Sequence, residues 1–294
     1  MIAASHKSKQ LLWQACKIGV ALLSIGYIIW YISIADFSWE QTVSFFSSLP
    51  FYFWLLLPMF SLSSWMVEST KWQVLVKEIE RISFSRSLYQ NFTSQAASFL
   101  TPLRAGEFAL KASYFEKQHR KNILKAVAFG NASQMIITTI FGLLGWWYLS
   151  GEPFWMLICG SMILLIAAVL APFFLKRLIL NFPVFRTLLF SAGRYILFSS
   201  SWVLLLSFSS IASSMLVLAM ITTMYLAVSI IPSIQIFDLA IKWSVASFFT
   251  TSLDIPMETM TAIVAVIWLN NTVLPVVLGS LLIPFPRLQK MVVS

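Results

Sequence analysis

The sequence predicts an all-α polytopic membrane protein, in which six full spans and two re-entrant helical hairpins form an inverted repeat. Three observations predict this fold class: the apolar composition, the separation of basic from acidic loops, and two apolar stretches that each contain a proline and a charge pair. The alternative is eight spans, in which the second stretch forms two ordinary ones. We expect one integral membrane domain over 1–294, with repeat halves at about 1–149 and 150–294.

The composition excludes a soluble enzyme. Of the 294 residues, 59% are hydrophobic and only 11% are charged, whereas a soluble domain carries about 25% charged residues. The two cysteines and two histidines lie far apart, so the sequence predicts no metal site and no disulfide framework. No glycine-rich nucleotide loop is present either. We therefore expect no cofactor, no metal and no separate catalytic domain.

Six stretches are apolar over the ~20 residues that a helix needs to cross a bilayer. They are Leu11–Ile34, Phe45–Val67, Ala126–Leu149, Phe154–Leu175, Tyr195–Ala212 and Thr259–Ile283. Two further apolar stretches, Phe92–Phe115 and Ser213–Phe249, are broken by prolines and charges.

Basic and acidic residues occupy opposite sides of this topology. With the N-terminus in the cytoplasm, all of the 20 lysines and arginines except Lys242 fall on the cytoplasmic side. The opposite loops carry only acidic residues, namely Asp36, Glu40, Glu152, Asp254 and Glu258. Because positive residues stay inside, we expect a cytoplasmic (inner) membrane protein with both termini cytoplasmic. The net charge of +9 then reflects insertion and contact with anionic lipid, and we expect no nucleic-acid partner.

The two broken stretches resemble one another. Residues 107–113 read Glu-Phe-Ala-Leu-Lys-Ala-Ser, and residues 238–244 read Asp-Leu-Ala-Ile-Lys-Trp-Ser. In both, an acid and a lysine at i,i+4 share one helix face and can pair. Each charge costs about 2.5–3.5 kcal/mol to insert into a bilayer, so finding the pair twice predicts a polar environment in the membrane.

Each pair also follows a break in the chain. We expect Pro102 with Gly106 to break the first stretch and Pro232 to break the second, because proline cannot continue a helix. Broken backbone at membrane depth has to be buried in protein or line a cavity. The sequence therefore predicts two helix–break–helix hairpins, over 91–115 and 213–249, whose tips meet near the midplane. Two spans, a hairpin and a span make up each half, so the second half starts outside and is inverted.

A family resemblance rests on the segment 101–111, which reads Thr-Pro-Leu-Arg-Ala-Gly-Glu-Phe-Ala-Leu-Lys. It resembles the Pro-x-Arg-x-Gly-Glu-x-x-x-Arg signature of the lysylphosphatidylglycerol synthase transmembrane family, a flippase-like, UPF-type integral membrane family. Members resemble the flippase portion of multiple peptide resistance proteins, which moves aminoacylated phosphatidylglycerol between leaflets. The chain departs in three ways: Lys111 replaces the final arginine, the second half lacks a glycine-rich motif, and no aminoacyl-transferase domain follows. The resemblance implies lipid movement and does not imply lipid synthesis.

The candidate substrate-binding residues are the charges of the two hairpins, Arg104, Glu107, Lys111, Asp238 and Lys242. A guanidinium beside a helix N-terminus suits a phosphate, although Arg104 could instead lock the hairpin to Glu107. The two acids could likewise couple transport to protons or only pair with their lysines.

Four amides are candidates for cavity lining, and interhelical hydrogen bonding is the alternative for each. They are Asn131, Gln134, Asn270 and Asn271.

The sequence therefore predicts a transporter or flippase that moves a phospholipid or lipid-linked headgroup between leaflets, with an anionic or aminoacylated phospholipid as partner. It leaves the lipid, the direction, the coupling ion and the oligomeric state open. Two alternatives are a lipid-modifying membrane enzyme that uses Arg104 and Glu107, and a non-transporting scaffold for a lipid-synthesis complex. A substrate-sized cavity favours the transporter, a metal or nucleophile at its base favours the enzyme, and a closed, packed core favours the scaffold.

Overall fold

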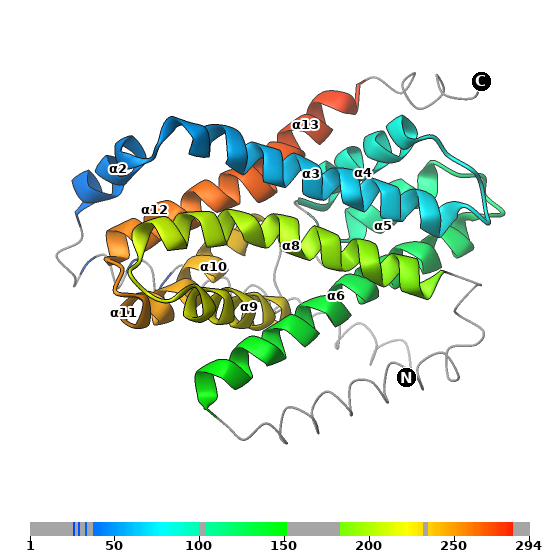
Figure 1. Ribbon diagram of the computed structural model, residues 1–294. Helices are drawn as coiled ribbons and strands as arrows, with labels where there is room; N and C mark the ends of the chain where they lie inside the picture. The colour runs from blue at the N-terminus through cyan, green and yellow to red at the C-terminus, as the bar shows by residue number, and fades with distance from the viewer. Residues whose placement is uncertain are drawn as a thin grey trace, which may run out of the picture.

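A computed structural model describes residues 38–99, 101, 104–151, 183–231 and 235–284, together with positions 26, 29 and 33. All regular elements in these ranges are helical, as predicted (Figure 1). The α-helices are α2 (Trp39–Ser48), α3 (Phe51–Val76), α4 (Phe84–Phe99), α5 (Ala105–Ser113), α6 (Arg120–Ser150), α8 (Val184–Ser209), α9 (Ser214–Ile230), α10 (Asp238–Ala246), α11 (Thr250–Leu253), α12 (Met257–Trp268) and α13 (Leu274–Leu282). Short 3₁₀ turns are η2 (Gln235–Phe237) and η3 (Ser247–Phe249), and η4 (Leu269–Val273) is a π-helical turn.

Several of these helices are long and apolar enough to cross a membrane. Within the described ranges they are α6, α8 and the continuous run from α12 to α13, with α2 and α3 together as a fourth candidate. The structure thus supports a multi-pass membrane protein. The predicted spans Leu11–Ile34 and Phe154–Leu175 lie outside the described residues.

Two predicted spans have different bounds in the structure. The stretch predicted at Phe45–Val67 is divided, since α2 and α3 meet at an angle of 90° on either side of Pro50. Helix α3 then continues to Val76. Helix α8 begins at Val184, eleven residues before the predicted start at Tyr195. Lys71 and Arg194, which the predicted topology counts on the cytoplasmic side, therefore lie inside helices, where both pair with the carboxylate of Glu68.

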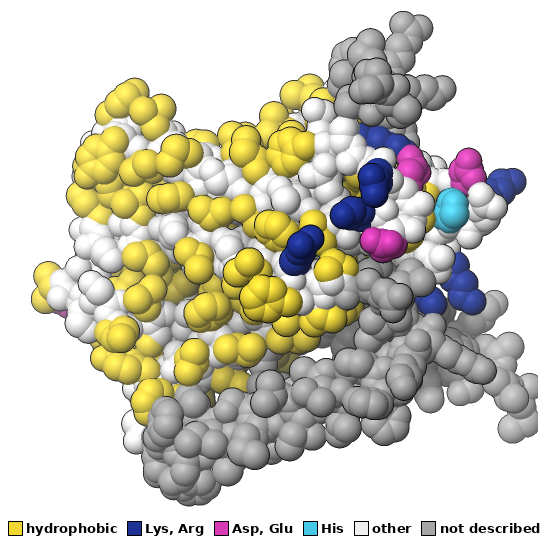
Figure 2. Space-filling view, turned by 45° about the vertical axis from the view of Figure 1, so that its right-hand side comes forward, with side chains coloured by type: hydrophobic (Ala, Val, Ile, Leu, Met, Phe, Trp, Pro, Cys, Tyr) yellow, Lys and Arg dark blue, Asp and Glu magenta, His cyan; other side chains and the backbone are white. Residues whose placement is uncertain are grey.

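Charged side chains gather at one end of the described structure. Figure 2 shows lysine, arginine, acidic and histidine side chains toward one edge and hydrophobic side chains over the remaining face. Many large apolar side chains are exposed. Phe185 and Phe51, for example, have exposed fractions of 78% and 77%. Extended exposed apolar surface of this kind is typical of a membrane-facing protein.

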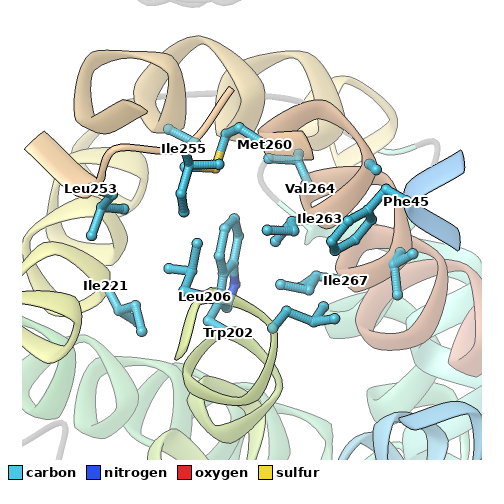
Figure 3. Close-up of a cluster of buried hydrophobic side chains, with 14 of the residues drawn as sticks. Phe45, Trp202, Leu206, Ile221, Leu253, Ile255, Met260, Ile263, Val264 and Ile267 are labelled. Atoms are coloured by element: carbon cyan, nitrogen blue, oxygen red, sulfur yellow. The ribbon is translucent and has the colours of Figure 1, made fainter. Parts of the chain in front are cut away.

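The main hydrophobic core lies at the other end, where α2, α8, α9, α10 and α12 meet. Trp202 of α8 stands at its centre and is surrounded by Leu206, Ile221, Met260 and Ile263 (Figure 3).

Both broken stretches form helix–break–helix hairpins. Helix α4 precedes the first break and α5 follows it, and α9 and α10 have the same order around the second. The first hairpin begins earlier than predicted, at Phe84. Gly106 allows the close approach of its two helices, because a Cβ there would lie 2.1 Å from the carbonyl oxygen of Ala97. The prolines expected at the breaks, Pro102 and Pro232, lie outside the described residues.

Candidate functional site

The tips of the two hairpins are in contact. The hydroxyl of Ser98, near the end of α4, donates a 3.1 Å hydrogen bond to Oε1 of Gln235 in η2. Beside this contact lies a cavity of about 480 Å³, lined by residues of α3, α4, α6, α8, α9, α10, η2 and η4. Arg104, Asp238 and Lys242 from the predicted site line it. Residues 131 positions apart in sequence, Arg104 and Gln235, therefore lie in the wall of one cavity.

Glu107 is the centre of the first hairpin's charges. Its Oε1 lies 2.9 Å from Nζ of Lys111, and its Oε2 lies 3.0 Å from Nε of Arg104. Asn131 of α6 donates a longer hydrogen bond of 3.4 Å to Oε2. The Lys111 ammonium also stands 4.4 Å from the ring centre of Trp72, a cation–π contact. One buried carboxylate is thus shared by two cations, and the predicted i,i+4 pairing is present.

Asp238 and Lys242 form the corresponding pair of the second hairpin. Nζ of Lys242 lies 2.6 Å from Oδ2 of Asp238, and the hydroxyl of Thr272 in η4 lies 3.5 Å from the same oxygen. Both charged residues line the cavity. The geometry accounts for the pairing of these side chains, and their role toward a substrate stays a prediction.

Arg104 has an unusual backbone conformation. It is the N-cap of α5, with φ 56° and ψ 30° in the left-handed region, which costs a non-glycine residue about 1–2 kcal/mol. Its side chain is 40% exposed and its Nη2 lies 3.3 Å from Oε1 of Gln95. Strained backbone of this kind persists where the surrounding structure fixes it, and it is common at functional sites.

A third charge cluster was missed by the sequence analysis. Glu68 of α3 lies 2.6 Å from Nζ of Lys71 and 2.9 Å from Nη1 of Arg194 in α8, both measured to its Oε2. The Arg194 guanidinium also stands 4.9 Å from the ring centre of Trp65, and both of these residues line the cavity. The sequence carries only a weak signal: Glu68 directly follows an apolar stretch, Lys71 comes three residues later, and further apolar residues follow Arg194.

The four predicted amides divide by position. Asn271 lines the cavity and donates a 3.4 Å hydrogen bond to the carbonyl of Phe198 in α8. Asn131 bonds Glu107, and Gln134 donates to the carbonyl of Ser191 in α8. Asn270 donates to a carbonyl of its own helix. In the described structure, Asn131 and Gln134 thus form hydrogen bonds between helices. Asn271 forms such a bond and also lines the cavity.

The described wall of the cavity has an excess of positive charge. It carries three cations, Arg104, Arg194 and Lys242, against one carboxylate, Asp238. Among the described residues, no cluster of histidine, cysteine and acidic side chains could hold a metal ion. Comparison with known proteins adds nothing to this picture, since no family model matches the chain and no curated protein matches it. The resemblance of segment 101–111 to the flippase-like family stays a prediction.

Proposed function

We propose that the protein is a membrane transporter that moves a lipid between the leaflets of the cytoplasmic membrane. The observation that carries the proposal is the charged cavity of about 480 Å³ beside the contact of the two hairpins. A lipid headgroup would bind there, with Arg104, Asp238 and Lys242 in the wall and Glu107 and Lys111 behind Arg104. The cavity favours a transporter over a scaffold with a closed core.

An inverted repeat would give this cavity its two sides. Four helices of the first half end at a nearly constant distance before four helices of the second half. Helix α3 ends 133 positions before α8, α4 ends 131 before α9, α5 ends 133 before α10, and α6 ends 132 before α13. Helices α3 and α8 pack against one another and run in opposite directions (Figure 1). These near-constant offsets support two copies of one unit, and the opposite directions support their inversion, an arrangement typical of transporters.

The packing between the proposed halves supports the same interpretation. Helix α4 packs on α13, and α9 packs on α6, so the first helix of each hairpin contacts the last helix of the other half. Both contacts are close: a Cβ at Gly279 would lie 1.9 Å from the carbonyl oxygen of Phe92, and one at Gly145 would lie 2.5 Å from that of Ala219. Rocking of one half against the other would expose the cavity to each leaflet in turn.

We further propose that both termini are cytoplasmic and that the basic end of Figure 2 faces the cytoplasm. A membrane-impermeant thiol reagent applied from outside should label cysteines placed at Glu40 and Asp254 and should not label one placed at Lys121. The reverse labelling pattern would contradict this orientation.

A flipping assay tests the proposed function. The purified full chain is reconstituted into vesicles that contain fluorescent lipids with a panel of headgroups, and the inner-leaflet lipid that becomes accessible to an impermeant quencher is measured. We expect movement for at least one lipid, loss of that movement in Arg104→Ala, and retention in Arg81→Ala. Arg81 is the matched control because it is exposed and lies outside the cavity. No movement of any lipid by a correctly folded protein would contradict the proposal.

A further inference from the structure

The charges around the cavity do not balance. Among the described residues, three clusters surround it: the Glu107 cluster (Arg104, Glu107, Lys111), the Glu68 cluster (Glu68, Lys71, Arg194) and the Asp238 pair (Asp238, Lys242). Five cations therefore share three carboxylates, which leaves a surplus of two positive charges. The Glu107 cluster and the Glu68 cluster each contribute one, and the Asp238 pair is neutral.

This surplus faces the cavity. Arg104 and Arg194 line it, whereas Glu107 and Glu68 do not and stand behind them. The side chains of Arg104 and Arg194 are 40% and 16% exposed, against 5% and 8% for the two glutamates. Nε of Arg194 is buried and has no hydrogen-bond partner among the described residues. The wall therefore exposes two guanidinium groups, whereas the carboxylates that pair with them stand behind it.

A surplus of this kind favours the binding of an anion. Uncompensated charge in a low-dielectric interior is costly, and guanidinium groups match phosphate oxygens better than an ammonium does. A phosphate monoester carries a charge of about −1.5 to −2 near neutral pH and offers three acceptor oxygens. A phosphodiester such as phosphatidylglycerol supplies only one negative charge, and its lysyl ester is positive overall.

We propose that the site binds a phosphate monoester, and that Arg194 is a binding residue beside Arg104 and Lys242. The source in a membrane is a lipid phosphomonoester, and this part of the inference rests on the proposed function. The alternative source of the same chemistry is free phosphate. Aminoacylated phospholipid, which the family resemblance implied, does not fit the charge of the wall.

A binding measurement on the purified full chain tests this inference. The probes are dioctanoyl phosphatidic acid, dioctanoyl phosphatidylglycerol, lysyl-phosphatidylglycerol and inorganic phosphate, and the signal is tryptophan fluorescence, since Trp65 lines the cavity under Arg194. We expect phosphatidic acid to bind at least about tenfold more tightly than phosphatidylglycerol, because one additional charge-assisted hydrogen bond has that effect. Equal or tighter binding of either phosphodiester would overturn the proposal.

Acidification provides a second readout. The second proton of a phosphomonoester binds at about pH 6, so affinity for phosphatidic acid should fall toward that for phosphatidylglycerol between pH 8 and pH 5. Among the described residues, the charged and titratable groups that face the cavity are Arg104, Arg194, Lys242, Asp238 and Tyr225. Phosphatidylglycerol is the control for their titration. A constant ratio of the two affinities over this range would contradict a dianion site.

Variants on one helix separate binding from net charge. Arg194→Gln should weaken phosphatidic acid binding about tenfold or more, whereas Arg186→Gln removes the same charge from an exposed position of α8 and should leave it unchanged. Arg194→Lys preserves the pairing with Glu68, so it covers the case in which the glutamine variant does not fold. The Arg194→Lys variant should bind phosphatidic acid at least about threefold more weakly than the wild type, because lysine lacks the planar, two-pronged donor group of arginine. Wild-type affinity in a folded Arg194 variant would overturn the assignment.

The outcomes distinguish this inference from the proposed function. Tight binding of phosphatidic acid without any lipid movement would support the phosphomonoester site and contradict the transporter. Movement of lysyl-phosphatidylglycerol without a preference for phosphatidic acid would support the transporter and contradict the phosphomonoester site. Inorganic phosphate that binds as tightly as phosphatidic acid would support the site's chemistry and contradict a lipid as its source.

Discussion

The two hairpins carry the same acid–lysine pair in unequal surroundings. The Glu107 side chain is 5% exposed, and its carboxylate contacts two cations and an amide donor. The Asp238 side chain is 19% exposed, pairs with one cation and lines the cavity. The packing of the two hairpins differs in the same direction. In the first hairpin, Gly106 allows close contact between α4 and α5, whereas the equivalent position of the second hairpin, 131 residues later, is the bulky Phe237. The comparison indicates that the first hairpin is the more buried and more tightly packed of the two.

The largest expected effect is on stability at the first hairpin. Glu107→Gln leaves Arg104 and Lys111 without their shared carboxylate, and breaking a buried pair costs about 3–5 kcal/mol. Asp238→Asn should cost only about 1–2 kcal/mol, since its pair is more exposed and has one cation. Unfolding of both variants in detergent micelles, followed by tryptophan fluorescence, measures the difference. Equal losses would remove the distinction between the two hairpins.

A smaller effect is expected from packing. Gly106→Ala should destabilise the protein by about 1–3 kcal/mol, because the new methyl group would overlap the backbone of Ala97. Gly193→Ala in α8 is the matched control: its Cβ would meet only a side-chain carbon of Val67 at 3.9 Å, and alanine favours a helix. The same unfolding assay applies. A neutral Gly106→Ala variant would show that the first hairpin is no more tightly packed than its surroundings.

The smallest effects concern the neutral donors of the two carboxylates. Asn131→Ala and Thr272→Val each remove one long hydrogen bond, of 3.4 and 3.5 Å, and should cost about 0.5–1.5 kcal/mol. We expect the Asn131 variant to lose more, because Glu107 is the more buried partner. A larger loss in the Thr272 variant would mean that the second hairpin depends on η4 for its position.

The sequence was most informative where charge interrupted an apolar pattern. The two acid–lysine pairs and the helix–break–helix form of both stretches were predicted, because i,i+4 spacing fixes one helix face and charges in apolar surroundings require partners. The Glu68 cluster was missed since a charge at the edge of an apolar stretch is indistinguishable from a loop residue until its partner on another helix is known. The bend between α2 and α3 was missed for a related reason: apolar residues continue on both sides of Pro50.

The most direct test of the account removes one charge pair and measures lipid movement. Glu107→Gln with Lys111→Met deletes the pair and leaves Arg104, which is 40% exposed and can be solvated, so we expect the double variant to fold. The control is Glu80→Gln with Arg86→Met, which deletes another ion pair from a position outside the cavity. If the Glu107–Lys111 pair positions Arg104 for the substrate, the folded Glu107–Lys111 variant loses lipid movement and the control retains it. Normal movement by the folded Glu107–Lys111 variant would show that these charges only hold the hairpin together.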